Sequence, residues 1–219
     1  MNTIKKNKLK DNVFSILQDA ILRGEFKPGD RIVETKIASD MGVSQGTVRE
    51  ALKELEHFGL IESRSYQGTY VKELTKKELS DAYDARLVLE VFAVESAANY
   101  LSPGELEIIR DLMEKMKVAA KTGDVHSFVD YDVMFHESIV QGCRNEMIEK
   151  LWHLVNVSLW TLVATNLSKR SLANLAIRHM DIYNTLENRD PQAARDAMKT
   201  HLLELRDEMI EKIEKKVCK

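Results

Sequence analysis

The sequence predicts a mainly α-helical protein with an N-terminal winged helix-turn-helix, containing a small β-hairpin, and a C-terminal all-α bundle of six or seven helices. A length of 219 residues allows one large domain or two small ones. Only three prolines are present and no glycine follows Gly142, which favours long helices in the last third. Alternating apolar and polar residues flank Gln67-Gly68, as in a hairpin. Charged residues between Lys72 and Lys77 suggest domains at residues 1–74 and 75–219.

Composition excludes several classes of protein. With 44% hydrophobic and 31% charged residues, the chain can form both a packed core and a solvated surface. No run approaches the roughly 18 apolar residues of a membrane span, and no apolar stretch follows the first lysines as in a secretory signal. Cys143 and Cys218 have no CxxC spacing. We therefore expect a cytoplasmic protein with no membrane partner.

Three short helices are expected before the hairpin. Apolar residues at helical spacing predict the first over Asn12–Leu22 and the second over Glu34–Met41, where Gly42 can end the helix in the left-handed conformation. Ser44 is a suitable N-cap for the third, which stops at Gly59. A tight Gly-Val-Ser turn thus joins two helices, as in a helix-turn-helix.

The third helix has the character of a recognition helix. Its apolar face is opposite the polar and basic residues near its amino end, which are Gln45, Gly46, Thr47, Arg49 and Lys53. Side chains of this kind can reach phosphates and base edges in a major groove. The alternative for Arg49 is an ordinary solvated charge.

These motifs resemble the GntR family of bacterial transcription regulators over about residues 11–74. The matching segments, in order, are FKPGDRI from Phe26, GVSQGTVREAL from Gly42 and GLI from Gly59. The resemblance implies that Lys36, Thr47 and Arg49 contact DNA and that the wing residues Gln67, Gly68 and Thr69 lie along or in the minor groove. Gln45 departs from the arginine usual in the family; Gln pairs with adenine and Arg with guanine, so the operator preference there is expected to differ.

Residues 75–219 are expected to form the helical bundle. One helix is predicted over about Ser80–Tyr100, and Ser102-Pro103 can begin the next. The segment from Lys121 to Asp124 breaks that helix, and Asp190-Pro191 marks another start. Polar residues interleaved between Leu151 and Leu167 could line a cavity. Trp152, Trp160 and Met147 are assigned to helix packing, with a pocket lining as the alternative.

Four residues of this domain could hold a metal ion. Asp132 and His136 share a helix face at i and i+4, and His179 and His201 each lie among apolar residues at helical spacing. A carboxylate and three imidazoles that converge between helices suit a divalent ion with open positions for an anionic ligand. Hydrogen-bonded core histidines are the alternative.

The second half resembles the FCD ligand-binding domain of the FadR-like subfamily over about residues 78–210. Matching features include Arg86 with Leu89-Glu90, Asp132-x3-His136, His179 and His201. The resemblance implies that Asp132, His136, His179 and His201 bind a divalent metal, zinc or nickel, and that a small carboxylate binds the metal. Arg86 would then contact this effector through paired hydrogen bonds; a salt bridge to Glu90 at i+4 is the alternative.

The leading functional hypothesis is a DNA-binding repressor. It would bind a short palindromic operator as a homodimer and respond to a small organic acid. The rival is a metal-dependent hydrolase with an accessory DNA-binding domain, for which Glu137 beside His136 is a poor general base because it points about 100° away. A third reading is a regulator with a purely structural metal.

Overall fold

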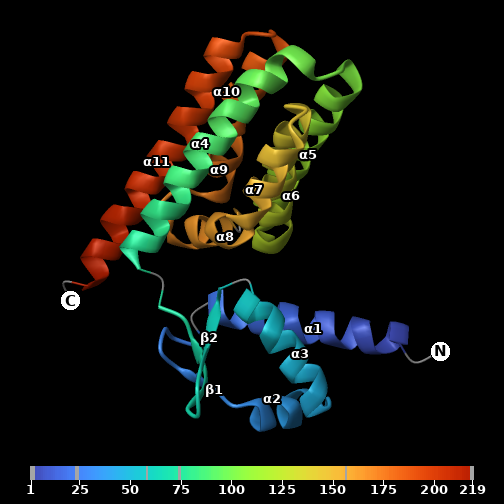
Figure 1. Cartoon of the computed structure of the whole chain (residues 1–219), viewed down its shortest axis with the longest axis vertical. Helices are drawn as coiled ribbons and strands as arrows, with labels where there is room; N and C mark the ends of the chain where they lie inside the picture. The colour runs from blue at the N-terminus through green and yellow to red at the C-terminus, as the bar shows by residue number, and fades with distance from the viewer. Residues whose placement is uncertain (1–2, 23–24, 58, 74, 156, 218–219) are drawn as a thin grey trace. The chain divides into compact units, whose positions relative to one another are not determined.

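The computed structural model describes residues 3–217, other than 23–24, 58, 74 and 156. The chain divides into two compact units, Met1–Leu74 and Thr75–Lys219 (Figure 1). Each unit has its own buried apolar residues. In the described part of the chain, no helix is both long and apolar enough to cross a membrane.

Unit 1 contains the helices of the predicted helix-turn-helix. They are α1 (Thr3–Leu22), α2 (Glu34–Met41) and α3 (Gln45–His57). Gly42 ends α2 with a φ of 64°, and the Ser44 hydroxyl accepts a hydrogen bond from the Thr47 amide at 3.2 Å. The apolar face of α3 is fully buried at Val48, Ala51 and Leu55. The turn therefore fixes the amino end of α3, while packing fixes its orientation.

A small antiparallel sheet completes unit 1. Its strands are β1 (Arg31–Ile32), β2 (Ile61–Arg64) and β3 (Gly68–Val71), in the order β1-β3-β2. The predicted hairpin is confirmed, with Ile61 opposite Val71. Strand β1 was not predicted, because two residues carry no periodic signal.

Unit 2 is entirely helical in its described residues. Its helices are α4 (Lys76–Tyr100), α5 (Pro103–Thr122), α6 (Val125–Gly142), α7 (Glu146–Leu154), α8 (Val157–Leu167), α9 (Leu172–Ile177), α10 (His179–Glu187) and α11 (Pro191–Val217). The fold class is confirmed, although these eight helices exceed the expected six or seven. One break was missed: α9 ends at Ile177, Arg178 lies between the two helices, and His179 is the first residue of α10 rather than a residue in mid-helix.

Side-chain caps fix where several of these helices begin. Thr75 and Glu78 form a capping box at α4, and Ser102 and Glu105 form another at α5, where Pro103 occupies the first turn as predicted. The Asn145 side chain caps α7 through two backbone amides. These caps set the register of the residues that each helix directs into the core.

Helix α4 is the central element of unit 2. It packs along α11 and also contacts α6, α7 and α10 (Figure 1). Fully buried side chains such as Tyr83, Phe135 and Met198 fill the space between these helices. Polar residues on α4, α6, α10 and α11 are thereby directed toward the same interior region.

Candidate functional site

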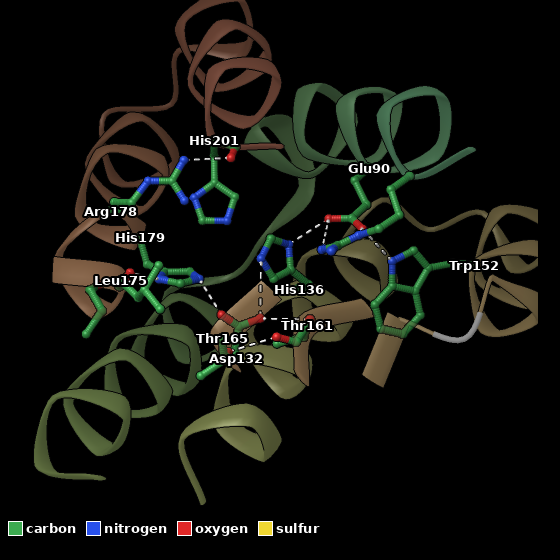
Figure 2. Close-up of polar contacts among 12 residues, drawn as sticks. Glu90, Asp132, His136, Trp152, Thr161, Thr165, Leu175, Arg178, His179 and His201 are labelled. Atoms are coloured by element: carbon green, nitrogen blue, oxygen red, sulfur yellow. Dashed lines mark hydrogen bonds and ion pairs between the residues drawn. The ribbon is translucent and has the colours of Figure 1, made fainter. Parts of the chain in front are cut away.

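Three histidines converge inside unit 2. His136 lies on α6, His179 begins α10 and His201 lies on α11, and each is at least 95% buried. One nitrogen of each ring lies within 4.8 Å of the other two (Figure 2). The structure thus brings together three residues that are up to 65 positions apart in the sequence.

Asp132 lies beside two of these histidines. Its Oδ2 is 3.2 Å from His179 Nε2, and its Oδ1 is 3.9 Å from His136 Nε2. The Thr161 hydroxyl donates to Oδ1 at 3.3 Å. Burial opposes ionisation of Asp132, but the neighbouring His179 and His136 outweigh it and lower the carboxyl pKa. The site therefore contains one anionic oxygen donor beside the imidazoles.

Outer contacts orient two of the rings. The Nδ1 of His179 lies 3.2 Å from the Leu175 carbonyl oxygen, and His136 Nδ1 lies 2.6 Å from Glu90 Oε2. A carbonyl oxygen can only accept, so the tautomer of His179 that donates from Nδ1 leaves the Nε2 lone pair available to a metal ion. The carboxylate beside His136 has the same orienting effect. Contacts of this kind accompany metal-bound histidines.

The arrangement of the three ring nitrogens suits coordination of a metal ion better than hydrogen bonding within the cluster. His136 Nε2, His179 Nε2 and His201 Nδ1 are buried and make no aligned hydrogen bond among the described atoms. Most buried polar atoms in proteins have such a partner. Burial, reinforced by His179 and His136, holds the pKa of His201 well below its usual value, so this ring is neutral at pH 7. Three imidazole nitrogens with one carboxylate are a donor set for zinc or nickel.

A buried carboxylate links the histidine cluster to two further helices. Glu90 accepts a hydrogen bond from Arg86 Nε at 2.6 Å. It accepts another from the Trp152 indole at 3.1 Å (Figure 2). Burial disfavours the charged form of Glu90, but Arg86 and His136 together hold its pKa well below the ordinary value. The salt bridge considered from the sequence is thus present, whereas the contacts of Glu90 with His136 and Trp152 were missed.

A small cavity of about 20 Å³ adjoins the cluster. All four predicted metal ligands and Arg86 line it. Its other polar lining residues are Tyr83, Thr161, Thr165 and Arg178. Tyr83 and Arg178 were missed, although Tyr83 lies one turn before Arg86 and Arg178 directly precedes His179.

In unit 1 the amino end of α3 is open to solvent at Gln45 and Gly46. Arg49 is also exposed, and its Nη2 lies 2.9 Å from Glu34 of α2. The expectation that Thr47 is exposed is wrong. It is 5% exposed, and its hydroxyl lies 2.9 Å from the Ser44 hydroxyl, because it belongs to the capping turn. Thr47 therefore supports the first turn of α3.

The remaining predicted DNA contacts lie on α2 and the wing. Lys36, Gln67 and Gly68 are exposed, and Thr69 is half-buried. A Cβ at Gly68 would lie 3.0 Å from Arg31 Nε, so the missing side chain lets the Arg31 guanidinium approach the wing. The Arg64 guanidinium carbon lies 4.5 Å from the centre of the Tyr70 ring. Arg31 adds positive charge near the wing that was not predicted, whereas Arg64 is paired with Glu62 at 2.7 Å.

Comparisons with known proteins agree with both halves of this geometry. Residues 9–71 match the bacterial regulatory proteins of the gntR family, and residues 81–204 match the FCD domain. A probable D-xylose utilization operon transcriptional repressor from Paenarthrobacter nicotinovorans is 33% identical over 206 residues, covering 92% of this chain and 91% of that protein. The chain belongs to the GntR family.

Other similar proteins are regulators too. The gluconate operon transcriptional repressor of Bacillus subtilis is 29% identical over 174 residues, which covers 80% of this chain and 70% of that protein. A crystal structure of a GntR regulator from a Rhodococcus species has the same fold, with a TM-score of 0.71, 23% identity and coverage of 92% and 97% of the two chains. This GntR protein is therefore a DNA-binding transcription regulator and not an enzyme. Glu137, the base considered for the hydrolase, lies 3.6 Å from the His153 ring instead.

Replacing Glu90 tests whether it orients the histidine cluster. Glu90→Gln removes the charge beside His136 while keeping the shape of the side chain. We expect zinc affinity of the full-length protein to fall roughly 10- to 100-fold, as for other residues that orient metal ligands. Competition with a chromophoric chelator would measure it. The control is Glu137→Gln, next to His136 on α6, which should leave zinc affinity unchanged. An unchanged zinc affinity in Glu90→Gln would contradict the orienting role of Glu90.

Proposed function

We propose that this protein is a transcriptional repressor that binds a short palindromic operator as a homodimer and responds to a small carboxylate at a divalent-metal site. The observation that carries the proposal is the convergence of three histidines and Asp132 on one buried cavity that Arg86 also lines. The repressor role is favoured by relatives described as repressors of operons. Such a protein would act on DNA in the cytoplasm.

The metal is proposed to be zinc or nickel, held by Asp132, His136, His179 and His201. Three buried ring nitrogens without an aligned hydrogen-bond partner support this assignment. A divalent ion satisfies all three and adds two positive charges at the centre of the site. Bound there, it would supply a Lewis-acidic position for a carboxylate oxygen.

The effector is proposed to be an organic acid drawn to this positive charge. Arg86 lines the cavity and adds a second cation, although part of its guanidinium group is bonded to Glu90. A cavity of about 20 Å³ has the capacity of roughly one water molecule. An organic acid must therefore move the surrounding helices, and a ligand that requires such a movement shifts the equilibrium between conformations of the helical domain.

DNA reading is proposed for α3 and the wing. Gln45 is the candidate for base contact, because its exposed amide can pair with adenine in the major groove. Arg49 and Lys36 are candidates for phosphate contact, and Gln67, Gly68 and Thr69 for minor-groove contact. Thr47 would act indirectly by holding the turn, because its backbone amide and its hydroxyl both bond to Ser44.

A homodimer is supported by an apolar surface on unit 2. Its exposed members are Val88, Phe92 and Tyr100 of α4 together with Met147, Leu151 and Leu154 of α7. Phe92, Tyr100 and Met147 line one surface hollow, so the two helix faces are contiguous. Contiguous apolar patches mark association surfaces, and a two-fold dimer would bury the same patch on both copies.

Operator binding tests the DNA assignments, with the site first obtained by selection from random duplexes. Arg49→Gln should weaken binding to all sequences and lower the salt dependence by about one phosphate contact. Gln45→Ala should cost about 1–3 kcal/mol and relax one base pair in each half-site. Lys121→Gln removes a charge from unit 2 as a control. Identical wild-type binding to selected and scrambled DNA would contradict specific recognition.

Charged substitutions on the apolar surface test the dimer. Phe92→Glu and Leu154→Glu should convert the protein to a monomer, because each places a charge in the proposed interface. Light scattering coupled to size-exclusion chromatography would report the mass. Ile108→Glu, at an exposed apolar position on α5, is the matched control. A monomeric wild type, or dimers that persist in both variants, would refute this interface.

Thermal melting tests the sensor. Acetate, lactate and succinate at about 100 times their Kd should stabilise the zinc-loaded protein by about 2.7 kcal/mol and leave the chelated protein unaffected. Both tryptophans of the chain lie in unit 2, so their fluorescence follows this unit alone. A stabilising acid should then change operator binding. If chelation lowers the melting temperature and no acid raises it, the metal is structural and the effector role is refuted.

A further inference from the structure

Two hydrogen-bond donors in the cavity wall have no assigned role in binding the metal. The Tyr83 hydroxyl and Arg178 Nη1 are both buried, and neither has a hydrogen-bond partner among the described atoms. Both residues line the cavity beside the histidines. Leaving a buried donor unpaired is costly, so two in one cavity indicate a ligand that accepts from them.

The orientation of Arg178 is fixed by its other terminal nitrogen. Nη2 donates to the His201 carbonyl oxygen at 2.7 Å and to Glu204 Oε2 at 3.2 Å. Figure 2 shows the guanidinium beside the His201 ring, held through that carbonyl. The side chain is only 11% exposed. With Nη2 committed to α11, Nη1 remains as a charged donor in the interior.

Tyr83 supplies a second donor that stays protonated. Its side chain is completely buried on α4, with the Arg86 guanidinium carbon 5.2 Å from the ring centre. Burial raises the pKa of the phenol to about 12, so the hydroxyl keeps its proton at neutral pH. The hydroxyl and Arg178 Nη1 can therefore both donate to an anionic oxygen.

Two other polar side chains of the cavity already have hydrogen-bond partners. Arg86 donates to Glu90 through Nε and Nη2, and the Thr165 hydroxyl donates to the Thr161 carbonyl. A carboxylate bound to the metal would use the ion's open position and would leave Tyr83 and Arg178 for a different part of the ligand. One carboxylate group alone does not account for both sets of groups.

We propose that the effector has two carboxylate ends, one bound to the metal and the other held by Arg178 Nη1 and the Tyr83 hydroxyl. This inference rests on the proposed function, because it assumes that the cavity binds an organic acid at the metal. It specifies the class of acid as a small dicarboxylate. The negative partner of Arg178, Glu204, is half exposed and engages only the outward nitrogen, so the inward nitrogen still favours an anion.

Calorimetric titration of the zinc-loaded, full-length protein with acetate, succinate and glutarate tests this assignment. We expect at least one dicarboxylate to bind roughly tenfold or more tightly than acetate, because a hydrogen bond to a charged group contributes about that factor. In Tyr83→Phe and Arg178→Gln this preference should fall by roughly tenfold. In Tyr83→Phe, which keeps the hydrogen bond from Arg178 to His201, acetate affinity and zinc affinity should stay unchanged.

Matched variants separate a binding role from a structural one. Tyr83→Phe removes a hydroxyl that bonds no described atom, so the ligand-free melting temperature should be unchanged or higher. This variant keeps the test valid if Arg178→Gln loses its link to His201 and folds poorly. Tyr183→Phe and Arg195→Gln, whose groups bond Glu187 and Glu95 elsewhere, should retain the full preference for the dicarboxylate.

Three distinguishable results would overturn either the dicarboxylate assignment or the proposed function on which it rests. If no dicarboxylate binds more tightly than acetate, the two-ended ligand is wrong while the metal-bound carboxylate stands. If the preference exists but survives in both Tyr83→Phe and Arg178→Gln, other residues hold the second end. If neither acetate nor a dicarboxylate binds the zinc-loaded protein, the proposed function itself fails.

Discussion

The buried carboxylate of Glu90 is the constraint on which the interior of the helical domain depends. A carboxylate removed from water must be matched by opposite charge and by donors, or it costs several kcal/mol. Glu90 has Arg86 one turn away on α4, the Trp152 indole from α7 and the His136 ring from α6. Those contacts require α4, α6 and α7 to keep one relative orientation. The same requirement fixes the direction of the His136 ring and hence the position of its Nε2.

Charge balance in the cavity makes metal and anion binding interdependent. Without an ion, Asp132 and Glu90 offset the cations Arg86 and Arg178, and an incoming carboxylate meets no net attraction from these four groups. A divalent ion among the histidines adds two positive charges at the point where the carboxylate would bind. Thermodynamic linkage makes this effect reciprocal. A ligand that binds the metal-loaded form more tightly raises the affinity of the protein for the metal by the same factor.

The fold could be predicted from the sequence because helix caps, turns and apolar helix faces are local signals that agree with it. Gly42, Ser44 and Ser102-Pro103 end or begin helices for reasons that involve only neighbouring residues, and the histidines could be placed inside from their apolar helix faces. Contacts between residues far apart in the sequence could not be predicted from such local patterns. The role of Glu90 depends on Trp152, 62 residues away, and helical spacing accounts for its contact with Arg86 alone. At Thr47 a local signal was misinterpreted. This polar residue near the start of a helix was assigned to the surface, although its hydroxyl completes the capping turn.

The position of α4 explains how the state of the cavity can reach the DNA-binding unit. Unit 1 ends at Leu74, and the Thr75 capping box fixes the start of α4 at Lys76, so this helix continues the chain directly from the DNA-binding unit. It also carries Tyr83, Arg86 and Glu90, each of which contacts or lines the site. Since the cavity of about 20 Å³ has room for little more than an ion or a water molecule, a larger ligand of the proposed kind would displace side chains of α4 or of the helices packed on it. A packed helix moves as a unit, so under the proposed function a displacement at Tyr83 would be transmitted along the two turns that separate it from Lys76.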